Sequence, residues 1–252
     1  MTFHKPIKVL GLITARGGSK GIPNKNIISL CGNPLLAYTA MAAKNSKLLD
    51  RVVITTDSLD IANVALQLGI EVPFIRPEYL AHDNSPHIDC VRHAIKALYL
   101  QNQYIADYVM ILQPTSPFRT SEDIDNAIRM AMQTSCDAVV GVVENCTHES
   151  KMYFVNNDFS TRPYIDNASC KSVERRQDCP VHYVENGAIY LQKTNSIFEE
   201  GNASSSKGGL ISSDLRAFIM PDHQSIDIDT PFDLKMAELL MTSLSEKREK
   251  TI

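Results

Sequence analysis

Short apolar runs alternate with segments of helical periodicity over the first 143 residues of the chain. The runs are typical of strands that are buried on both faces, and the segments between them repeat apolar side chains every three or four positions. Because such alternation needs crossover connections, we predict an α/β fold with a mainly parallel, doubly wound sheet. The predicted strands are 9–14, 52–56, 72–75, 108–112 and 137–143, and the predicted helices are 34–42, 58–68, 88–98 and 121–132.

The alternation stops at about residue 143. Polar and turn-forming residues then dominate, and they are equally consistent with a plain surface insertion and with an excursion over the site or toward a second subunit. Apolar runs return at 188–191, 218–220 and 225–229, and Thr230, Pro231 and Asp233 form a capping signature for a last helix. We therefore predict four parts, namely a core over 1–143, an excursion over 144–187, a return to the core over 188–244 and a solvated tail over 245–252.

The composition is that of a globular protein and argues against a disordered, nucleic-acid-binding or membrane-spanning chain. Hydrophobic residues make up 44% of the chain and charged residues 21%, which is ordinary for a globular domain and unlike a disordered chain. The net charge of -4 argues against broad nucleic-acid binding, and no apolar run approaches the roughly 18 residues of a membrane span. We expect no nucleic-acid or membrane partner, a cytoplasmic location, and buried free thiols in place of disulfides or zinc because the six cysteines form no C-x-x-C pair.

A glycine-rich, cationic loop follows the first predicted strand directly. We expect its glycines to adopt positive φ and to bring backbone N–H groups close to an anion, while its cations pair with phosphate oxygens. The loop has neither the Gly-Lys-Ser/Thr of a P-loop nor the glycine spacing of a dinucleotide fold, and a flexible surface turn is the plain alternative. A triphosphate site is favoured because ligands bind at such strand ends. The residues concerned are Gly17, Gly18, Gly21, Arg16, Lys20 and Lys25.

Two carboxylates lie two positions apart near the end of the chain. On an extended strand, Asp227 and Asp229 would project from the same face, with Ile226 and Ile228 turned toward the core. Mg²⁺ is commonly held by one or two carboxylates together with substrate phosphates. Alone, the pair would be the acidic outer face of a strand, but beside a phosphate loop it predicts a magnesium site.

Further candidates lie at other predicted strand ends. The turn 113–120 contains two prolines and presents Gln113, whose amide suits a sugar hydroxyl or N-acyl group, and Arg119, which either binds an anion or pairs with the acidic residues after it. Arg176 has the geometry to bind a carboxylate or is solvated, and Asn186 either contacts a ligand or begins a turn. Five histidines without metal-ligand spacing are predicted to be solvent-facing or structural: His82, His87, His148, His182 and His223.

Five motifs in order resemble the acylneuraminate cytidylyltransferases, or CMP-sialic acid synthetases. They are Ala15–Asn26, Leu112–Pro117, Arg175–Gln177, Asn186–Tyr190 and Ser225–Asp229, and their spacing agrees along nearly the whole chain. The related CMP-Kdo synthetases carry a different first loop and rank second. The resemblance implies a nucleotide-diphospho-sugar transferase fold and a Mg²⁺-dependent homodimer whose excursion crosses to its partner. It also implies that CTP is coupled to a nine-carbon 2-keto acid sugar.

The resemblance implies a role for individual residues. Catalysis would rest on Arg16, Lys20, Asp227 and Asp229, the last two also binding the metal. Glu185 stands where some sialic acid enzymes have a basic residue, so legionaminic and pseudaminic acid stay as open as N-acetylneuraminic acid. A non-catalytic nucleotide-binding module and a sugar-phosphate cytidylyltransferase are the alternatives. CTP would contact Arg16, Gly17, Gly18, Ser19, Lys20, Lys25 and Asn26, with Arg76, Asp83 and Ser85 near the cytidine, and the sugar would contact Gln113, Arg176 and Asn186.

Overall fold

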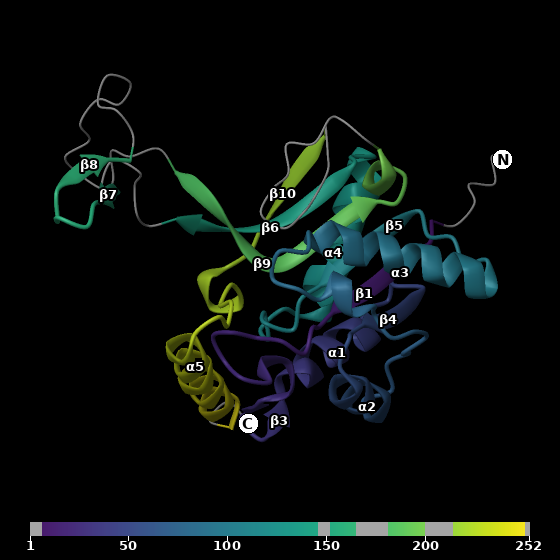
Figure 1. The fold of residues 1–252 in the computed structure, drawn as a ribbon, viewed down its shortest axis with the longest axis horizontal. Coiled ribbons are helices and arrows are strands. Elements are labelled where there is room, and N and C mark those ends of the chain that lie inside the picture. The colour runs from purple at the N-terminus through teal and green to yellow at the C-terminus, as the bar shows by residue number, and fades with distance from the viewer. Residues whose placement is uncertain (1–6, 146–151, 165–180, 200–213, 250–252) are drawn as a thin grey trace.

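The computed structural model describes residues 7–145, 152–164, 181–199 and 214–249, which form a six-stranded sheet with helices on both faces (Figure 1). Strands β1, β4, β5, β6 and β10 share one direction, and β9 runs antiparallel between β5 and β6. The mainly parallel, doubly wound sheet is therefore confirmed. Its order is β10 (Leu215–Ile219), β6 (Ala138–Asn145), β9 (His182–Lys193), β5 (Tyr108–Leu112), β1 (Val9–Thr14) and β4 (Arg51–Thr55).

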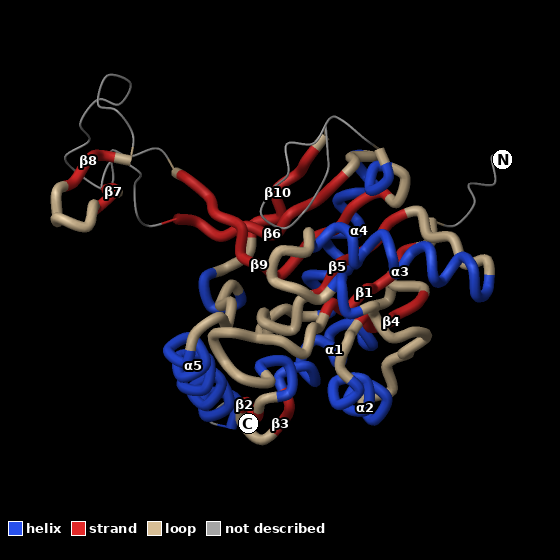
Figure 2. The backbone as a smooth tube through the Cα atoms, in the orientation of Figure 1, coloured by secondary structure: helices blue, strands red, loops and turns tan. Residues whose placement is uncertain are grey.

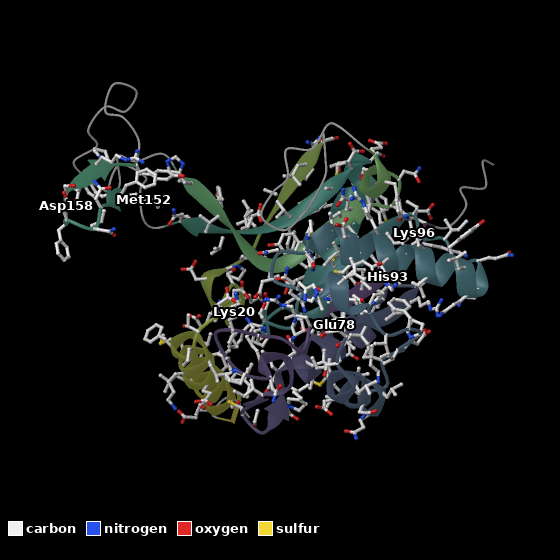
Figure 3. All side chains as sticks on the ribbon, in the orientation of Figure 1. Lys20, Glu78, His93, Lys96, Met152 and Asp158 are labelled. Atoms are coloured by element: carbon white, nitrogen blue, oxygen red, sulfur yellow. The ribbon has the colours of Figure 1, made fainter. Side chains whose placement is uncertain are left out.

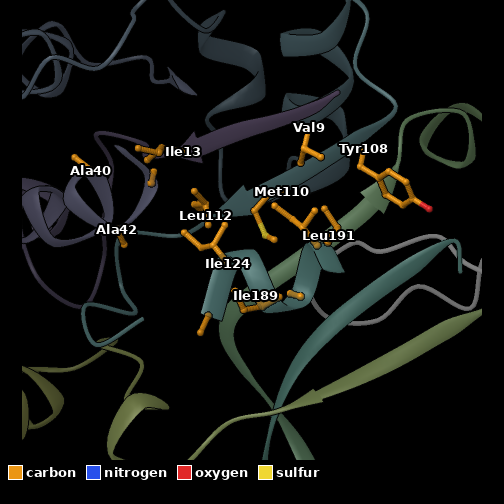
Figure 4. Packing of buried hydrophobic residues seen from close by; sticks show 14 of the residues in the cluster. Val9, Ile13, Ala40, Ala42, Tyr108, Met110, Leu112, Ile124, Ile189 and Leu191 are labelled. Carbon is orange, nitrogen blue, oxygen red and sulfur yellow. The ribbon is translucent and has the colours of Figure 1, made fainter. Parts of the chain in front are cut away.

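Two apolar cores cover the two faces of the sheet. Successive side chains of β1 alternate between them, with Val9 and Ile13 in one core and Leu10 and Leu12 in the other. Figure 4 shows the first core, in which Ile13, Met110 and Leu112 pack with helix residues such as Ile124. That core includes α1 (Leu35–Asn45), α2 (Leu59–Gln67) and α4 (Ser121–Thr134), while α3 (His87–Asn102) packs on the opposite face.

Side chains cap the starts of α2 and of the last helix. The Ser58 side chain accepts a hydrogen bond from the Ile61 N–H at the start of α2. At α5 (Pro231–Glu249), the Asp233 carboxylate accepts from the N–H of Thr230 at 2.8 Å, and the Thr230 hydroxyl accepts from the Asp233 N–H at 3.3 Å. The predicted capping box is confirmed. The helix continues through Glu249, so the predicted solvated tail begins as helix, with Ser245 and Glu246 exposed.

Two predictions of local structure are wrong. Residues 72–75 form no strand, because Pro73 lacks the N–H that a sheet ladder needs, and only a bridge between Val53 and Glu71 remains. Residues 225–229 form neither strand nor helix and lie outside the sheet, held by a hydrogen bond from the Ile228 N–H to the Thr115 carbonyl at 2.9 Å. Helix α1 begins one residue after its predicted start, and Pro34 is both its N-cap and part of the short strand β3 (Asn33–Pro34), which pairs with β2 (Ser29–Leu30).

Strands β6 and β9 extend beyond the rest of the sheet. Residues 143–145 and 182–184 pair only with each other in the described register, and this ribbon leads away from the body toward a small hairpin (Figures 1 and 2). The hairpin consists of β7 (Tyr153–Val155) and β8 (Thr161–Pro163) and lies within the segment predicted as an excursion. Across the described ranges, no helix combines the length and apolar character needed to cross a membrane.

Candidate active site

A cavity of about 310 Å³ lies where β1 and β5 end. Lys20, on the loop after β1, lies between α5 and the sheet and far from the hairpin residue Asp158 (Figure 3). The position matches the expectation that ligands bind at the carboxyl ends of parallel strands. The lining residues are Thr14, Arg16, Ser19, Lys20, Gly21, Lys25, Asn26, Arg76, His87, Gln113, Pro114, Thr115 and Asp229.

The cationic loop and the late acidic segment meet in this cavity. Lys25 Nζ lies 2.8 Å from Asp229 Oδ1, although the two residues are 204 positions apart. A Cβ on Gly21 would lie 2.5 Å from the Asp229 carbonyl oxygen, so only glycine permits this close approach of the two backbones. Ile22 and Ile228 belong to the same buried apolar cluster and hold the two segments together. The predicted convergence is confirmed.

The glycines of the loop do not have the backbone conformation that we predicted. None of Gly17, Gly18 and Gly21 has positive φ, and the left-handed residue of this loop is Asn24, with φ of 52°. Asparagine tolerates that conformation because its short polar side chain relieves the strain locally. The Gly17 N–H is directed at a carboxylate, donating to Asp57 Oδ1 at 3.0 Å. The predicted role of positive φ in exposing the loop's N–H groups is therefore wrong.

Two cations of the loop share one carboxylate. Arg16 Nη1 lies 2.8 Å from Asp83 Oδ1, and Lys20 Nζ lies 2.6 Å from Asp83 Oδ2. Hydrogen bonds from Lys20 and then from Arg16 lower the pKa of Asp83 below its usual value, so this carboxylate is charged at neutral pH. The structure thus places Asp83 beside the predicted phosphate-binding cations.

The two late carboxylates have unlike surroundings. Asp229 is exposed and lines the cavity, whereas Asp227 packs against Thr115 and against Gly187, whose φ is +75°. Burial raises the pKa of Asp227, and a hydrogen bond from Thr115 opposes that rise. Asp227 Oδ1 is buried and has no hydrogen-bond partner among the described residues. Because 225–229 is not a sheet strand, the prediction that both carboxylates occupy one strand face is wrong.

In the predicted cytidine-binding loop, which contains Arg76 and Ser85, some residues line the cavity and others do not. Arg76 is buried and lines the cavity, and its Nη2 donates to the Thr55 carbonyl at 2.6 Å. Ser85 donates to the Tyr79 carbonyl at 2.6 Å and is not among the lining residues. His87, predicted to be solvent-facing or structural, has its Nε2 3.1 Å from Thr14 Oγ1 and also lines the cavity.

Comparison with known proteins identifies the family. The sequence profile of the cytidylyltransferase family matches residues 10–207. The chain belongs to this family. It is therefore a nucleotidyltransferase, as the resemblance of its motifs implied.

Several relatives are similar over nearly the whole chain. The sequence is 34% identical to a CMP-N,N'-diacetyllegionaminic acid synthase of Legionella pneumophila, covering 93% of this chain and 97% of that protein. It is 32% identical to a pseudaminic acid cytidylyltransferase of Campylobacter jejuni, covering 93% and 96%. It is also 32% identical to an N-acylneuraminate cytidylyltransferase of Escherichia coli, covering 91% of this chain and 51% of that one.

A solved structure confirms the fold independently. A CMP:2-keto-3-deoxy-manno-octonic acid synthetase complexed with CTP superposes with a TM-score of 0.68, covering 94% of this chain and 99% of that one. The sequence identity of 16% is too low to carry more than the fold. The nucleotide-diphospho-sugar transferase type of fold, expected from the resemblance, agrees with this neighbour.

In this cytidylyltransferase, Arg119 has a structural role, but its hydrogen-bond partners are two backbone carbonyls and Thr39, whereas the sequence suggested the acidic residues after it. It is 3% exposed, and it donates to the Ala188 carbonyl at 2.8 Å and to Thr39 Oγ1 at 2.6 Å. Its two Nη atoms also contact the Gln113 carbonyl at 3.3–3.4 Å. Burial lowers the pKa of Arg119 to about 10, which leaves it charged at neutral pH. Arg119 therefore holds the backbone of Gln113, which lines the cavity, against β9.

The Asn186 side chain makes its hydrogen bonds within the protein. Arg176 lies outside the residues that the structure describes. Asn186 Nδ2 donates to Ser225 Oγ at 3.0 Å, and its Oδ1 accepts from the Ala188 N–H at 3.1 Å. These bonds place Gly187 against Asp227. Asn186 is buried and is not among the lining residues, so the structure does not bring it to the cavity with Gln113. Its contact with a sugar stays a prediction.

Replacing Arg119 by methionine is expected to lower the free energy of unfolding by about 2–3 kcal/mol. The substitution keeps most of the side-chain volume but leaves the carbonyls of Gln113 and Ala188 without these donors. Urea unfolding followed by circular dichroism measures the change. Arg129→Met on α4 is the control, because Arg129 is about half exposed and contacts Asn126. Equal stability of the two variants would contradict the structural role of Arg119.

Proposed function

We propose that this enzyme couples CTP to a nonulosonic acid, a nine-carbon 2-keto acid sugar, in a Mg²⁺-dependent reaction that yields the CMP-sugar and pyrophosphate. The observation that carries the proposal is the contact of Lys25 with Asp229, which joins a phosphate-type loop to an acidic segment in one cavity. The names of the relatives support the substrates, since they include synthases and transferases for legionaminic, pseudaminic and acylneuraminic acids. A structural neighbour of the same fold was solved with CTP.

The cavity is suited to a polyphosphate because of its charge. Arg16, Lys20, Lys25 and Arg76 all line it, and Asp229 is the one carboxylate among the described lining residues. Guanidinium and ammonium groups pair with phosphate oxygens through charge-assisted hydrogen bonds. Asn26 is buried, and its Nδ2 donates to the Arg16 carbonyl at 2.9 Å, so it fixes the backbone from which Arg16 extends. We assign the triphosphate of CTP to this cluster of cations, with the Ser19 hydroxyl as a further donor.

The two late carboxylates fit a hard divalent cation. Asp229 lies at the cavity wall, and the buried Oδ1 of Asp227 lacks a partner within the described ranges, as an oxygen reserved for a ligand would. Among the residues that the structure describes, no group of three or more His, Cys, Asp or Glu side chains could hold a metal ion. Phosphate oxygens of the substrate would therefore complete the coordination shell of Mg²⁺. When bound, Mg²⁺ would neutralise charge on the phosphate oxygens.

The proposed reaction is an in-line displacement at the α-phosphorus of CTP. The anomeric hydroxyl of the sugar forms the new O–P bond and releases its proton to solvent, and the bond from the α-phosphorus to the bridging oxygen breaks, so pyrophosphate leaves with the electron pair. The protein forms no covalent bond to the substrates in this reaction. Catalysis depends on positioning the two reactants and on stabilising the negative charge that spreads over the phosphate oxygens in the transition state. We assign the departing phosphates to Arg16 and Lys20, which line the cavity.

Replacing Asp227 by asparagine is expected to raise the melting temperature of the free enzyme at pH 7 while abolishing most of its activity. Burial raises the pKa of Asp227, so the fold favours the protonated form, and the ionised carboxylate costs stability once the pH exceeds that pKa. The neutral amide avoids this cost. The stability gain should shrink as the pH falls toward the ordinary carboxyl value of 3.8.

Thermal melts at pH 7 and at pH 4 measure both effects of the Asp227→Asn substitution. CTP with Mg²⁺ should raise the melting temperature of the wild-type enzyme more than that of the variant, because the variant lacks one metal ligand. A variant that is less stable than wild type at pH 7, or that keeps full activity, would contradict this assignment.

A panel of sugars tests the substrate class. We propose that Gln113, Arg176 and Asn186 contact the sugar, and that Arg176 binds the carboxylate of the sugar. Pyrophosphate release is measured with CTP, Mg²⁺ and, in turn, N-acetylneuraminic, legionaminic, pseudaminic and 3-deoxy-manno-octulosonic acid. Release with one of the nine-carbon acids supports the proposal, and release only with the eight-carbon acid points to the CMP-Kdo type. A shift in melting temperature with CTP but no release with any sugar would indicate a nucleotide-binding module.

We also propose that the enzyme is a homodimer formed through the β7–β8 hairpin. Tyr153, Val155, Phe159 and Tyr164 are exposed on the hairpin, which lies away from the body on the β6–β9 ribbon. Apolar side chains gathered on a projecting element are typical of a surface that a partner covers. Sedimentation equilibrium gives the mass directly, and a monomer at micromolar concentration would contradict the proposal.

A further inference from the structure

Asp83 engages two of the three cations of the phosphate loop that line the cavity. Its two oxygens contact Arg16 Nη1 at 2.8 Å and Lys20 Nζ at 2.6 Å, so one carboxylate bridges them. Arg16 Nη1 also donates to the Ala81 carbonyl at 3.4 Å, in the same loop as Asp83. The resemblance assigns Asp83 to the cytidine, but its observed partners are the groups that we assign to the triphosphate.

The loop that carries Asp83 keeps its shape through bonds of its own. Ser85 bonds to Tyr79 through its hydroxyl and to the His82 carbonyl through its N–H at 3.0 Å, and the Ala81 N–H bonds to the Glu78 carbonyl at 2.8 Å. By contrast, the side chains in the two Asp83 ion pairs are 36–80% exposed. Exposed ion pairs contribute little stability each. The Asp83 carboxylate can therefore exchange its partners without unfolding the loop.

We propose that Asp83 is an internal competitor for the phosphate-binding cations: it gives up Arg16 and Lys20 to the triphosphate of CTP and takes them back when pyrophosphate leaves. The inference rests on the proposed function for the identity of the polyphosphate. A carboxylate next to phosphate oxygens repels them and accepts from the same donors, so both anions cannot be satisfied at once. Asp83 thereby weakens substrate binding and also product binding, which favours release of pyrophosphate.

Asp83→Asn tests this inference, because the amide has the same shape but no charge. Asp89→Asn is the matched control: Asp83 and Asp89 have the same side-chain exposure of 40%, and Asp89 pairs with Arg92, which does not line the cavity. Isothermal titration with inorganic triphosphate needs neither nucleoside nor sugar. We expect Asp83→Asn to bind it about tenfold more tightly than wild type, and Asp89→Asn to bind it as wild type does.

Steady-state kinetics supply the second readout. Asp83→Asn should show a lower KM for CTP and stronger inhibition by added pyrophosphate, while Asp89→Asn should show neither. Unchanged or weaker triphosphate binding by Asp83→Asn would overturn the inference, as would an equal gain in both variants, which would indicate a general effect of net charge. Because the titration contains no sugar, tighter binding without turnover on any sugar would contradict the proposed function and leave this inference standing.

Discussion

Replacing Gly21 by alanine is expected to lower the rate of pyrophosphate release by about 10²–10³-fold. The added Cβ would lie 2.5 Å from the Asp229 carbonyl oxygen, a backbone atom that cannot rotate away. The loop and the acidic segment must then separate, which breaks the contact of Lys25 with Asp229 and displaces the cations from the reacting phosphates. Misplacement by a fraction of an ångström is enough to remove the advantage of preorganised charge.

Gly18→Ala is the control for this effect. A Cβ at Gly18 would meet nothing within 4 Å, and Gly18 does not have positive φ, so alanine fits there without strain. Both variants lose a glycine from the same loop and so lose similar backbone freedom in the unfolded chain. Steady-state assays of the two proteins compare them directly. Equal activity of both would contradict the view that contact between the two segments builds the site.

Replacing Lys20 by alanine is expected to lower kcat/KM for CTP by about 10²–10³-fold with almost no change in stability. The Lys20 side chain is 80% exposed, so its removal creates no cavity and its ion pair with Asp83 is weak. Lys20 contributes to catalysis through the positive charge that it presents to the phosphates as the leaving group departs. Kinetic assays and thermal melts on the same preparation separate the two effects.

Lys235→Ala is the matched control for Lys20. The Lys235 side chain is 68% exposed and pairs with Glu238 on α5, outside the residues that line the cavity. Its loss changes the net charge by the same amount. If the two variants have equal kcat/KM, or if Lys20→Ala melts well below wild type, Lys20 does not act on the phosphates as we infer.

Local sequence signals predicted much of the fold because neighbours in the chain determine them. Strand β5 coincides with the predicted run 108–112, and Thr230 caps its helix as expected. The direction of β9 could not be predicted, since a short apolar run such as 188–191 fits a parallel or an antiparallel neighbour equally well. Residues 225–229 have the alternation of a strand, but only tertiary contacts decide whether a sheet edge is available to them.

The candidate site could be predicted in outline and not in its internal contacts. The cationic loop and Asp229 meet as expected because both segments adjoin the same end of the sheet. The burial of Arg119 and the pairing of Asp83 depend on residues far apart in the sequence, which no motif records. The place of His87 at the cavity could not be predicted for the same reason, because Thr14, which it contacts, lies 73 positions away.

Strand β9 passes from the projecting ribbon into the buried core without a loop between them. Its Asn186–Gly187 step sits where the exposed half of the strand becomes buried, and Gly187 touches Asp227 there. The strand that carries the exposed ribbon thus continues directly into the contact with Asp227. A displacement of residues 182–184 would therefore reach Asp227 along one continuous strand.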